Sequence, residues 1–423
     1  MKKVSILNFP EEFDEETGVR VYGETSYENH MAVLSHFLHN RKNGLSNVDK
    51  IEIIRLLRNF LTEKGFKQNV MELSDHDVLS VAEDPAQYEL FSDFFDVPFP
   101  APENPQFTFI DLFAGIGGFR IAMQNVGGKC VYSSEFDANA QQTYLSNYGE
   151  MPFGDITKES TKRFIPKDFD VLCGGFPCQA FSIAGYQRGF EDTRGTLFFD
   201  VAQIVKQCQP KAIFLENVKN LKSHDKGNTF RVIKSTLEQL GYMVFDKIMS
   251  PDVYANIPQN RERIFIVAFN VEKVPNCSDF QFPEKVKLTN TIHNCIDYTV
   301  DDPRFFYTEK MAHYSELEGS ITSKDTIYQW RRVYVRENKS NLCPTLTANM
   351  GMGGHNVPLI LTDDGIRKLT PKECLNFQGY PDNYKFPSSM SMSACYKQIG
   401  NSVAVPLIQK VSLQIWKILQ NNS

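Results

Sequence analysis

The sequence FIDLFAGIGG, from Phe109 to Gly118, gives the clearest indication of the fold. An apolar strand, Phe107–Leu112, ends in a tight glycine turn, after which a helix is expected to begin. Gly115 and Gly117 let the backbone approach a ligand closely, and the first N–H groups of the helix can bind it. About 20 residues further on, Glu135 follows the second predicted strand, where a carboxylate is well placed for two ribose hydroxyls. Together these features predict a site for a nucleoside-type cofactor.

Beyond this stretch, apolar strands continue to alternate with helices up to about residue 285. Such alternation predicts an α/β domain with a parallel sheet and helices on both faces. From Lys285 to Ile366 the alternation stops, which predicts a small, irregular, β-rich domain; helical periodicity returns at Val403–Leu419. The predicted strands are Phe107–Leu112, Cys130–Ser134, Val171–Gly174, Ala212–Glu216 and Ile264–Phe269, and the predicted helices between them include Gly117–Val126 and Ala138–Ser146.

The first 96 residues differ in character from the rest of the chain. The linker VPFPAPENPQ, Val97–Gln106, has four prolines in ten residues, which continue neither a helix nor a central strand. Before it, Val48–Gly65 has the apolar spacing of an amphipathic helix, with Asn47 as a candidate N-cap. Residues 1–105 carry a net charge of −9 and the remainder +3. This charge favours a helical extension packed on the main body over a DNA-binding helix-turn-helix.

Length and composition exclude several classes of protein. The chain has 423 residues, of which 42% are hydrophobic and 23% charged, so bulk disorder is excluded. No apolar run reaches the ~20 residues of a membrane span, and the N-terminus lacks an apolar stretch for a signal peptide. The nine cysteines have no metal-binding spacing. We therefore expect no metal, no membrane contact, and reduced thiols in a cytoplasmic protein.

Three further motifs place reactive or charged side chains next to predicted strands. Cys178 lies in GGFPCQAFS, Gly174–Ser182, in a loop at the carboxyl edge of the sheet, which makes it a candidate nucleophile. Glu216 ends the strand in LENV, so its carboxyl group is expected to face the same cleft. Arg261 and Arg263 alternate at the start of QNRERIFIVAF, so both can point into one site. Alone, each motif also fits a buried thiol, a helix-capping acid or a solvated charge cluster.

The motifs, in this order, resemble the cytosine-C5 DNA methyltransferase family. The resemblance continues through RKLTPKECLNFQGYP, Arg367–Pro381, and QIGNSVAVPLI, Gln398–Ile408. It covers roughly residues 107–285 and 366–420, and its overall look is that of a bacterial or phage restriction-modification enzyme. The joint match of ordered motifs is far more specific than any single one.

The resemblance implies an S-adenosylmethionine-dependent, Rossmann-like methyltransferase fold with a small target-recognition domain. The predicted organisation is an N-terminal helical extension (1–96), a proline-rich linker (97–106), a catalytic and cofactor-binding domain (107–285), a target-recognition domain (286–366) and a C-terminal segment that returns to the catalytic domain (367–423). The implied cofactor-binding residues are Phe113, Gly115, Gly117, Glu135, Phe136, Asp155, Ile156, Asn401 and Ser402.

The chemistry of cytosine fits the candidate catalytic residues. Cytosine C5 is a poor nucleophile until a thiolate, that of Cys178, adds at C6. Protonated Glu216 is expected to donate to N3, which requires a dry pocket that raises the pKa of its carboxyl group. Arg263 is expected to bind O2, and Arg261 to support the Cys178 loop. The target base must first leave the double helix.

Recognition of double-stranded DNA is assigned to two stretches. The loop from Ser182 to Leu197 is the expected clamp, because its glycines supply hinges and its arginines can meet phosphates. YQWRRVYVRENKS, Tyr328–Ser340, has a net charge of +3, and arginine is the usual reader of guanine. The expected DNA-binding residues are Gln179, Ser182, Arg188, Arg194, Arg331, Arg332, Arg336 and Thr345.

Two alternative functions remain open from the sequence. One is an RNA cytosine-C5 methyltransferase on the same scaffold. The other is a DNA-binding regulator that uses the N-terminal helices. We expect a monomer, because modification of a single base needs no twofold partner.

Overall fold

The computed structural model describes ten segments of the chain: residues 13–14, 19–20, 27–40, 50–66, 72–81, 92–177, 197–311, 313–331, 334–351 and 357–421. Several predicted features lie outside the described residues. These are the proposed N-cap Asn47, the loop that follows Ser182, and the site residues Cys178, Gln179, Ser182, Arg188, Arg194 and Arg332.

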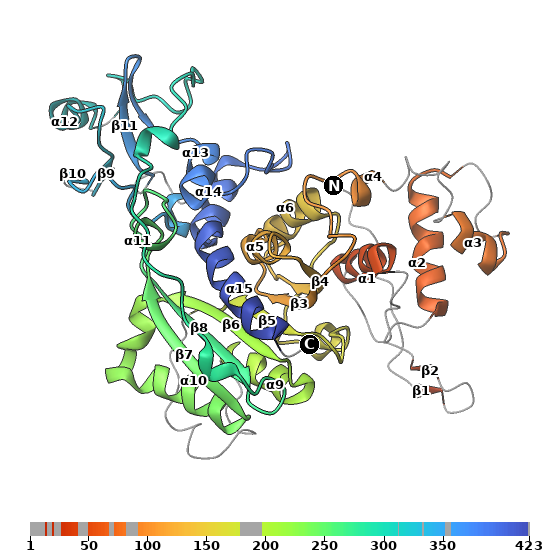
Figure 1. Ribbon diagram of the computed structural model, residues 1–423. Coiled ribbons are helices and arrows are strands. Elements are labelled where there is room, and N and C mark those ends of the chain that lie inside the picture. The colour runs from red at the N-terminus through yellow and green to blue at the C-terminus, as the bar shows by residue number, and fades with distance from the viewer. Residues whose placement is uncertain are drawn as a thin grey trace.

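A six-stranded sheet forms the centre of the molecule (Figure 1). Its strand order is β4-β3-β5-β6-β8-β7. The strands are β3 (Phe107–Leu112), β4 (Gly128–Ser134), β5 (Val171–Gly175), β6 (Ala212–Val218), β7 (Tyr242–Met249) and β8 (Arg263–Asn270). The first three and β6 are parallel to one another, whereas β8 runs antiparallel to both of its neighbours. The prediction of an all-parallel sheet is therefore wrong for β8, because apolar periodicity does not encode strand direction.

Helices cover both faces of this sheet, as the strand-helix alternation predicts. One hydrophobic cluster joins alternate side chains of the strands to α5, α6 and α15, and a second joins the opposite face to α9 and α10. The central strands are buried on both faces, because alternate side chains of each strand pack into one cluster and the side chains between them pack into the other. The helices of this domain are α5 (Gly118–Gln124), α6 (Ala138–Tyr148), α7 (Glu159–Lys162), α9 (Leu197–Cys208), α10 (Asn228–Gln239), α11 (Pro251–Tyr254) and α15 (Val405–Gln420), with 3-10 turns at Lys219–Lys222, His224–Gly227, Cys277–Asp279 and Ile292–Asn294.

The N-terminal segment packs against the domain of the six-stranded sheet. Its described elements are β1 (Phe13–Asp14), β2 (Val19–Arg20), α1 (Tyr27–Asn40), α2 (Lys50–Glu63), α3 (Asp75–Val81) and α4 (Ser92–Phe95). Buried side chains of α1 and α2 belong to the same hydrophobic cluster as one face of the sheet. The Ser35 hydroxyl also accepts a hydrogen bond from the backbone N–H of Met151, at 3.0 Å. The structure thus agrees with an extension packed on the main body.

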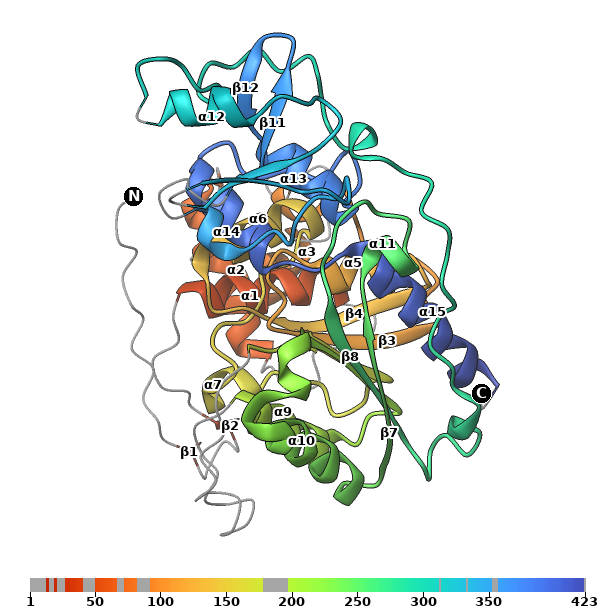
Figure 2. The same cartoon turned by 90° about the vertical axis from the view of Figure 1, so that its left-hand side faces the viewer.

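A second, four-stranded antiparallel sheet forms a small lobe, which lies at the top of the view in Figure 2. Its order is β10-β9-β11-β12. The elements here are β9 (Tyr328–Trp330), β10 (Val335–Glu337), β11 (Leu359–Thr362), β12 (Gly365–Lys368), α12 (Tyr314–Ser320) and the 3-10 turn η6 (Ala348–Gly351). The helices α13 (Pro371–Gln378) and α14 (Met392–Asn401) then lead back to the large sheet. Among the described residues, no helix is long and apolar enough to cross a membrane.

Candidate active site

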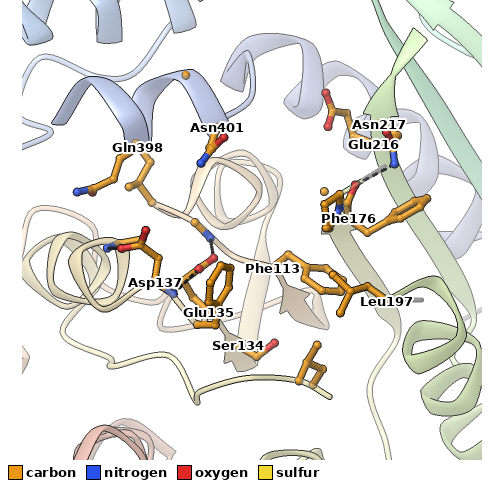
Figure 3. A pocket seen from close by; sticks show the side chains of 18 of the residues that line it. Phe113, Ser134, Glu135, Asp137, Phe176, Leu197, Glu216, Asn217, Gln398 and Asn401 are labelled. Atoms are coloured by element: carbon orange, nitrogen blue, oxygen red, sulfur yellow. Dashed lines mark hydrogen bonds between the residues drawn. The ribbon is translucent and has the colours of Figure 1, made fainter. Parts of the chain in front are cut away.

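A cavity of about 560 Å³ lies at the carboxyl ends of the parallel strands, beside α14 (Figure 3). Its lining comes from segments that are far apart in the sequence. Ten of the predicted site residues line it: Phe113, Gly115, Glu135, Phe136, Asp155, Ile156, Glu216, Arg261, Arg263 and Asn401. Most of the predicted cofactor residues and three of the predicted catalytic residues therefore share one cavity.

The turn after β3 holds its residues in left-handed backbone conformations. Phe113 has φ 56°, Gly115 φ 55° and Gly117 φ 77°. For a non-glycine residue such as Phe113 this conformation is strained, and proteins keep such strain mainly at functional sites. At Gly117 a Cβ atom would lie 2.3 Å from the ring of Tyr148, so only glycine fits there. The turn thus presents Phe113 and Gly115 to the cavity, while Gly117 packs beneath them and does not line it.

Glu135 anchors the glycine turn from the next strand. Its two carboxylate oxygens accept backbone N–H groups of Gly115 and Asp137, each at 2.8 Å. Burial raises the pKa of Glu135, and these two donors oppose the rise. The next side chain, Phe136, is 77% exposed although it lines the cavity. A large aromatic ring left in solvent at a cavity mouth offers a flat apolar surface to a planar ligand.

The remaining wall of this half comes from the loop between α6 and α7 and from α14. Asp155 accepts hydrogen bonds from the backbone N–H and hydroxyl of Thr157, at 3.0 and 2.8 Å, and Ile156 is buried beside it. Across the mouth, Lys397 of α14 donates to Asp137 at 2.7 Å. Burial works against the charge of Asp137, but Lys397 outweighs it and lowers the pKa of that carboxyl group. The ion pair ties α14, which carries Asn401, to the start of α6.

The other half of the cavity holds a carboxylate and a guanidinium in contact. The Glu216 Oε1 atom lies 3.0 Å from Arg263 Nε. The antiparallel direction of β8 creates this pair, because it brings the start of β8 to the carboxyl end of β6, where Arg263 pairs with Val218. Burial raises the pKa of Glu216, and Arg263 and Arg261 oppose the rise. The direction is the one expected for a carboxylic acid that must donate a proton or a hydrogen bond.

The described side-chain hydrogen bonds of Arg261 lie with the small lobe and with the end of α14, whereas its predicted support of the Cys178 loop concerns residues outside the described ones. Its guanidinium is buried and donates to the carbonyl oxygens of Leu346, at 2.7 Å, Gly400, at 3.2 Å, and Ser402. Arg261 therefore fastens the small lobe and the end of α14 to the active-site strand. Ser402 is also buried, and its hydroxyl meets that of Tyr380, so its side chain does not line the cavity. Those contacts depend on packing across domains, which a local motif does not reveal.

A second, polar cavity of about 440 Å³ lies on the small lobe. Arg336 of β10 pairs in register with Gln329 of β9, and Arg331 Nη2 donates to Gln329 Oε1 at 3.1 Å. The Thr345 hydroxyl donates to the carbonyl of Asn260, at 2.6 Å. The structure thus brings together the three described residues that the sequence assigns to DNA reading: Arg331, Arg336 and Thr345 all line this cavity.

Sequence reasoning missed several residues that line the first cavity. Asn217 donates to the Phe176 carbonyl at 2.8 Å and so fixes the backbone just before Pro177. Asp137 had one local signal, an N-cap pattern, since it accepts the N–H groups of Asn139 and Ala140. No local signal marks its partner on α14. The missed lining residues with polar side chains are Ser134, Asp137, Asn217, Lys397 and Gln398.

Comparison with known proteins identifies the family. Residues 107–417 match the model of the C-5 cytosine-specific DNA methylases. The type II methyltransferase M.Bsp6I of Bacillus sp. (strain RFL6) is 50% identical over 311 residues, which cover 72% of this chain and 97% of that protein. The type II methyltransferase M.HpaII of Haemophilus parainfluenzae is 45% identical over 370 residues, or 81% of this chain and 97% of that protein.

Solved structures show the same fold. The S. pombe Dnmt2 methyltransferase superposes with a TM-score of 0.55 at 18% identity, over 74% of this chain and 98% of that chain. A putative DNA modification methyltransferase from a prophage of E. coli gives a TM-score of 0.53 at 18% identity, over 74% and 100% of the respective chains. This chain belongs to the C-5 cytosine-specific DNA methylase family and is a DNA (cytosine-5)-methyltransferase.

Proposed function

We propose that this methyltransferase modifies C5 of a cytosine flipped out of a specific double-stranded DNA sequence, with S-adenosylmethionine as methyl donor. We further propose that it protects DNA from a cognate restriction endonuclease, as a type II enzyme like its relatives. The observation that carries the proposal is the juxtaposition of two half-sites in one cavity. Glu135 and Phe136 lie in one half, and the Glu216–Arg263 pair lies in the other.

The first half-site fits the methyl donor. The aromatic rings of Phe113 and Phe136 and the buried carboxylate of Glu135 suit an adenosine group, which offers a flat ring and two adjacent hydroxyls. Asp155, Ile156 and Asn401 close this half of the cavity. Bound there, S-adenosylmethionine supplies an electrophilic methyl group on a sulfonium.

The second half-site fits the cytosine. In the proposed reaction the Cys178 thiolate forms a bond to C6, and the electron pair moves toward C5, N3 and O2. Protonated Glu216 donates to N3, and Arg263 binds O2. C5 then takes the methyl group, a base removes the C5 proton, and elimination breaks the bond to Cys178. Pro177, bonded to Cys178, lines the cavity, which supports this assignment.

The remaining assignments are part of the same proposal. Arg331, Arg336 and Thr345 contact the DNA target from the small lobe, together with Arg332. Gln179, Ser182, Arg188 and Arg194 are proposed to contact the DNA as well. The five-part division of the chain, with boundaries at residues 96, 106, 285 and 366, and a monomeric enzyme complete the proposal.

Nucleoside mass spectrometry tests the reaction. Plasmid DNA and tRNA are incubated separately with the enzyme and S-adenosylmethionine. We expect 5-methylcytosine in the DNA alone, and bisulfite sequencing of that sample then gives the target site. Methylation of tRNA alone would contradict the proposed substrate and support the RNA alternative.

A cysteine variant tests the covalent step. Cys178→Ala is expected to abolish methyl transfer and to leave DNA binding and S-adenosylmethionine binding intact, because the thiol is needed only to form the bond to C6. Methyl transfer is followed with labelled donor, and DNA binding by gel shift. Methyl transfer by the variant near the wild-type rate would contradict the proposed covalent mechanism.

A further inference from the structure

The N-terminal segment places a histidine against a buried ion pair of the catalytic domain. Arg120 of α5 and Glu150, after α6, form a two-pronged salt bridge with N–O distances of 2.8 and 3.1 Å, and neither side chain is exposed. His36 of α1 is equally buried, and its Nε2 atom lies 3.4 Å from Glu150 Oε2. The family match begins at residue 107, so α1 lies outside it. The contact between His36 and Glu150 therefore joins a segment outside the matched region to a residue within it.

Arg120 connects this cluster to the glycine turn of the cofactor half-site. Its guanidinium lies 4.9 Å from the ring centre of Tyr148. The Tyr148 hydroxyl donates to the carbonyl oxygen of Gly117 at 2.7 Å, and the same ring fills the space that a side chain at Gly117 would need. A continuous row of buried contacts thus runs from α1 to the turn that presents Phe113 and Gly115.

A second row of contacts reaches the opposite wall of the same half-site. The His36 ring packs on Phe153, with ring centres 4.8 Å apart. The Phe153 carbonyl accepts the backbone N–H of Glu135 at 2.8 Å, and residue 154 directly after it begins the lining of the cavity. The His36 side chain therefore contacts Glu150, which leads to one wall of the half-site, and Phe153, which leads to the other.

The loop that carries Glu150 also packs closely against α1 and α4. Gly149 has φ 71°, and a Cβ atom there would lie 1.8 Å from the carbonyl oxygen of Phe94 and 3.0 Å from His39 Nε2. His39 in turn lies 3.1 Å from the Gly149 carbonyl oxygen. Met151 donates to Ser35, and Glu150 contacts His36. Each of residues 149 to 151 therefore contacts the N-terminal segment.

We propose that His36 is a positioning residue through which the N-terminal segment sets the geometry of the cofactor half-site, by way of Glu150, Arg120 and Tyr148 and by way of Phe153. The inference rests on the proposed function, because the half-site is taken to bind S-adenosylmethionine. Binding of the donor and docking of α1 are then energetically coupled, and the coupling is reciprocal. Docking of the segment tightens donor binding, and the bound donor holds the segment in place.

Calorimetric titration of the full-length enzyme with S-adenosylmethionine tests the coupling. His36→Leu keeps the approximate volume of the side chain but removes its polar contact with Glu150. We expect its Kd for the donor to rise about tenfold, the scale of coupling carried by a packed row of residues. His36→Gln, which keeps a polar group near Glu150, is expected to recover most of the affinity. The KM for DNA and kcat at saturating donor should remain near wild type.

A matched control separates positioning from general loss of stability. Ile53→Val removes one methylene from the buried face of α2, in the same hydrophobic cluster as α1, and Ile53 is not itself a member of the row of contacts. It should lower the melting temperature to a similar extent and leave the donor Kd unchanged. An equal rise of Kd in Ile53→Val, or an unchanged Kd in His36→Leu, would overturn the inference.

Two further measurements keep the test decisive. If His36→Leu does not fold, Tyr148→Phe removes the hydrogen bond to Gly117 at the other end of the row, and an unchanged donor Kd there also overturns the inference. Wild-type enzyme is titrated first. Its failure to bind S-adenosylmethionine would refute the proposed cofactor site itself, whereas binding by wild type with no effect of the variants refutes only the positioning role.

Discussion

Glu216 shows how one side chain acquires its chemical state from its surroundings. Its strand position makes it face the cavity, burial raises the pKa of its carboxyl group, and Arg263 limits the rise. In the proposed mechanism, a protonated Glu216 is the form that donates to a ring nitrogen of cytosine. The balance between burial and the arginine therefore decides which fraction of the enzyme is competent at a given pH.

Glu216→Gln is expected to lower kcat by about 10²- to 10³-fold, because the amide donates a hydrogen bond but cannot transfer a proton. In wild type, kcat should fall as pH rises through the raised pKa of Glu216, since the carboxyl group loses its proton there. This descending limb should be absent in the variant. Single-turnover rates over a pH series measure both effects, and an unchanged limb in Glu216→Gln would assign it to another group.

The guanidinium of Arg331 can either read a base or bind a phosphate. Its Nη2 atom already bonds Gln329, which fixes the fork on the sheet surface. Arg331→Ala should therefore reduce the free-energy difference between matched and mismatched DNA sites by about 1–3 kcal/mol. Its effect on the salt dependence of binding should be the smaller of the two. The same test applies to Arg332→Ala. Competition binding with matched and mismatched sites at several salt concentrations checks this. A uniform loss across all sequences would make the residue a phosphate contact.

At the scale of elements, strand β8 determines the second half-site. Had β8 run parallel to β6, Arg263 would have lain at the opposite edge of the sheet from Glu216. The sequence predicted both residues because each sits at the end of a short apolar run, but such a run has no direction. The edge strand β7 escaped prediction because its side chains are mostly half-buried and include Asp246 and Lys247, so its pattern is weak.

The junction of α14 with η6 supports a prediction about packing. A Cβ atom on Gly400 would lie 2.1 Å from the backbone of Thr347 and 2.3 Å from that of Ala348, neither of which can move alone. Gly400→Ala should therefore lower the free energy of unfolding by about 1–3 kcal/mol, the usual cost of overpacking.

Chemical denaturation measures this loss, and Gly319→Ala is the matched control. A methyl group on Gly319, in α12, would meet no atom of the described residues within 4 Å, so alanine there should be neutral or slightly stabilising. Equal effects of the two substitutions would mean that the close approach at Gly400 carries no energetic weight. Because Asn401 follows directly, the Gly400 variant should also bind the methyl donor less tightly.

For the molecule as a whole, acid should loosen the N-terminal segment from the sheet domain. Burial lowers the pKa values of His36 and His39, with Glu150 opposing the change. The unfolded chain therefore binds more protons than the folded chain below about pH 6.5, and stability falls as pH drops through that value, by up to ~1.4 kcal/mol per pH unit for each histidine.

The ion pair adds to this effect at lower pH. Burial opposes the charge of Glu150, but Arg120 and the histidines lower its pKa to about 2, so its contribution is lost as pH falls from its usual range toward that value. Thermal unfolding between pH 7 and pH 5 measures the histidine part. In His36→Leu, the free energy of unfolding should change less steeply with pH, by up to ~1.4 kcal/mol per pH unit, the value for one proton. An equally steep pH dependence in the variant would contradict the assignment.

The candidate site was predictable from sequence to the extent that it is local. Phe113, Glu135 and Glu216 each lie at the end of an apolar strand, and the carboxyl ends of parallel strands meet at one edge. The pairing of Asp137 with Lys397 joins residues 260 positions apart, and no local pattern encodes it. The same holds for Arg261, whose three carbonyl partners come from the small lobe and from the end of α14. The partners of Asp137 and Arg261 are set by packing between distant parts of the chain, which local motifs do not encode.

The placement of α14 and α15 bears on how the enzyme is made in the cell. The proposed donor half-site combines Phe113 from early in the chain with Asn401 from late in it, and α15 packs on α5, the helix that follows the glycine turn. At about 5–20 residues per second, translation takes on the order of 15–60 s to pass from one to the other. A nascent chain from which Asn401 has not yet emerged therefore lacks one wall of the pocket, and methylation of nearby DNA must wait until α14 has emerged and docked.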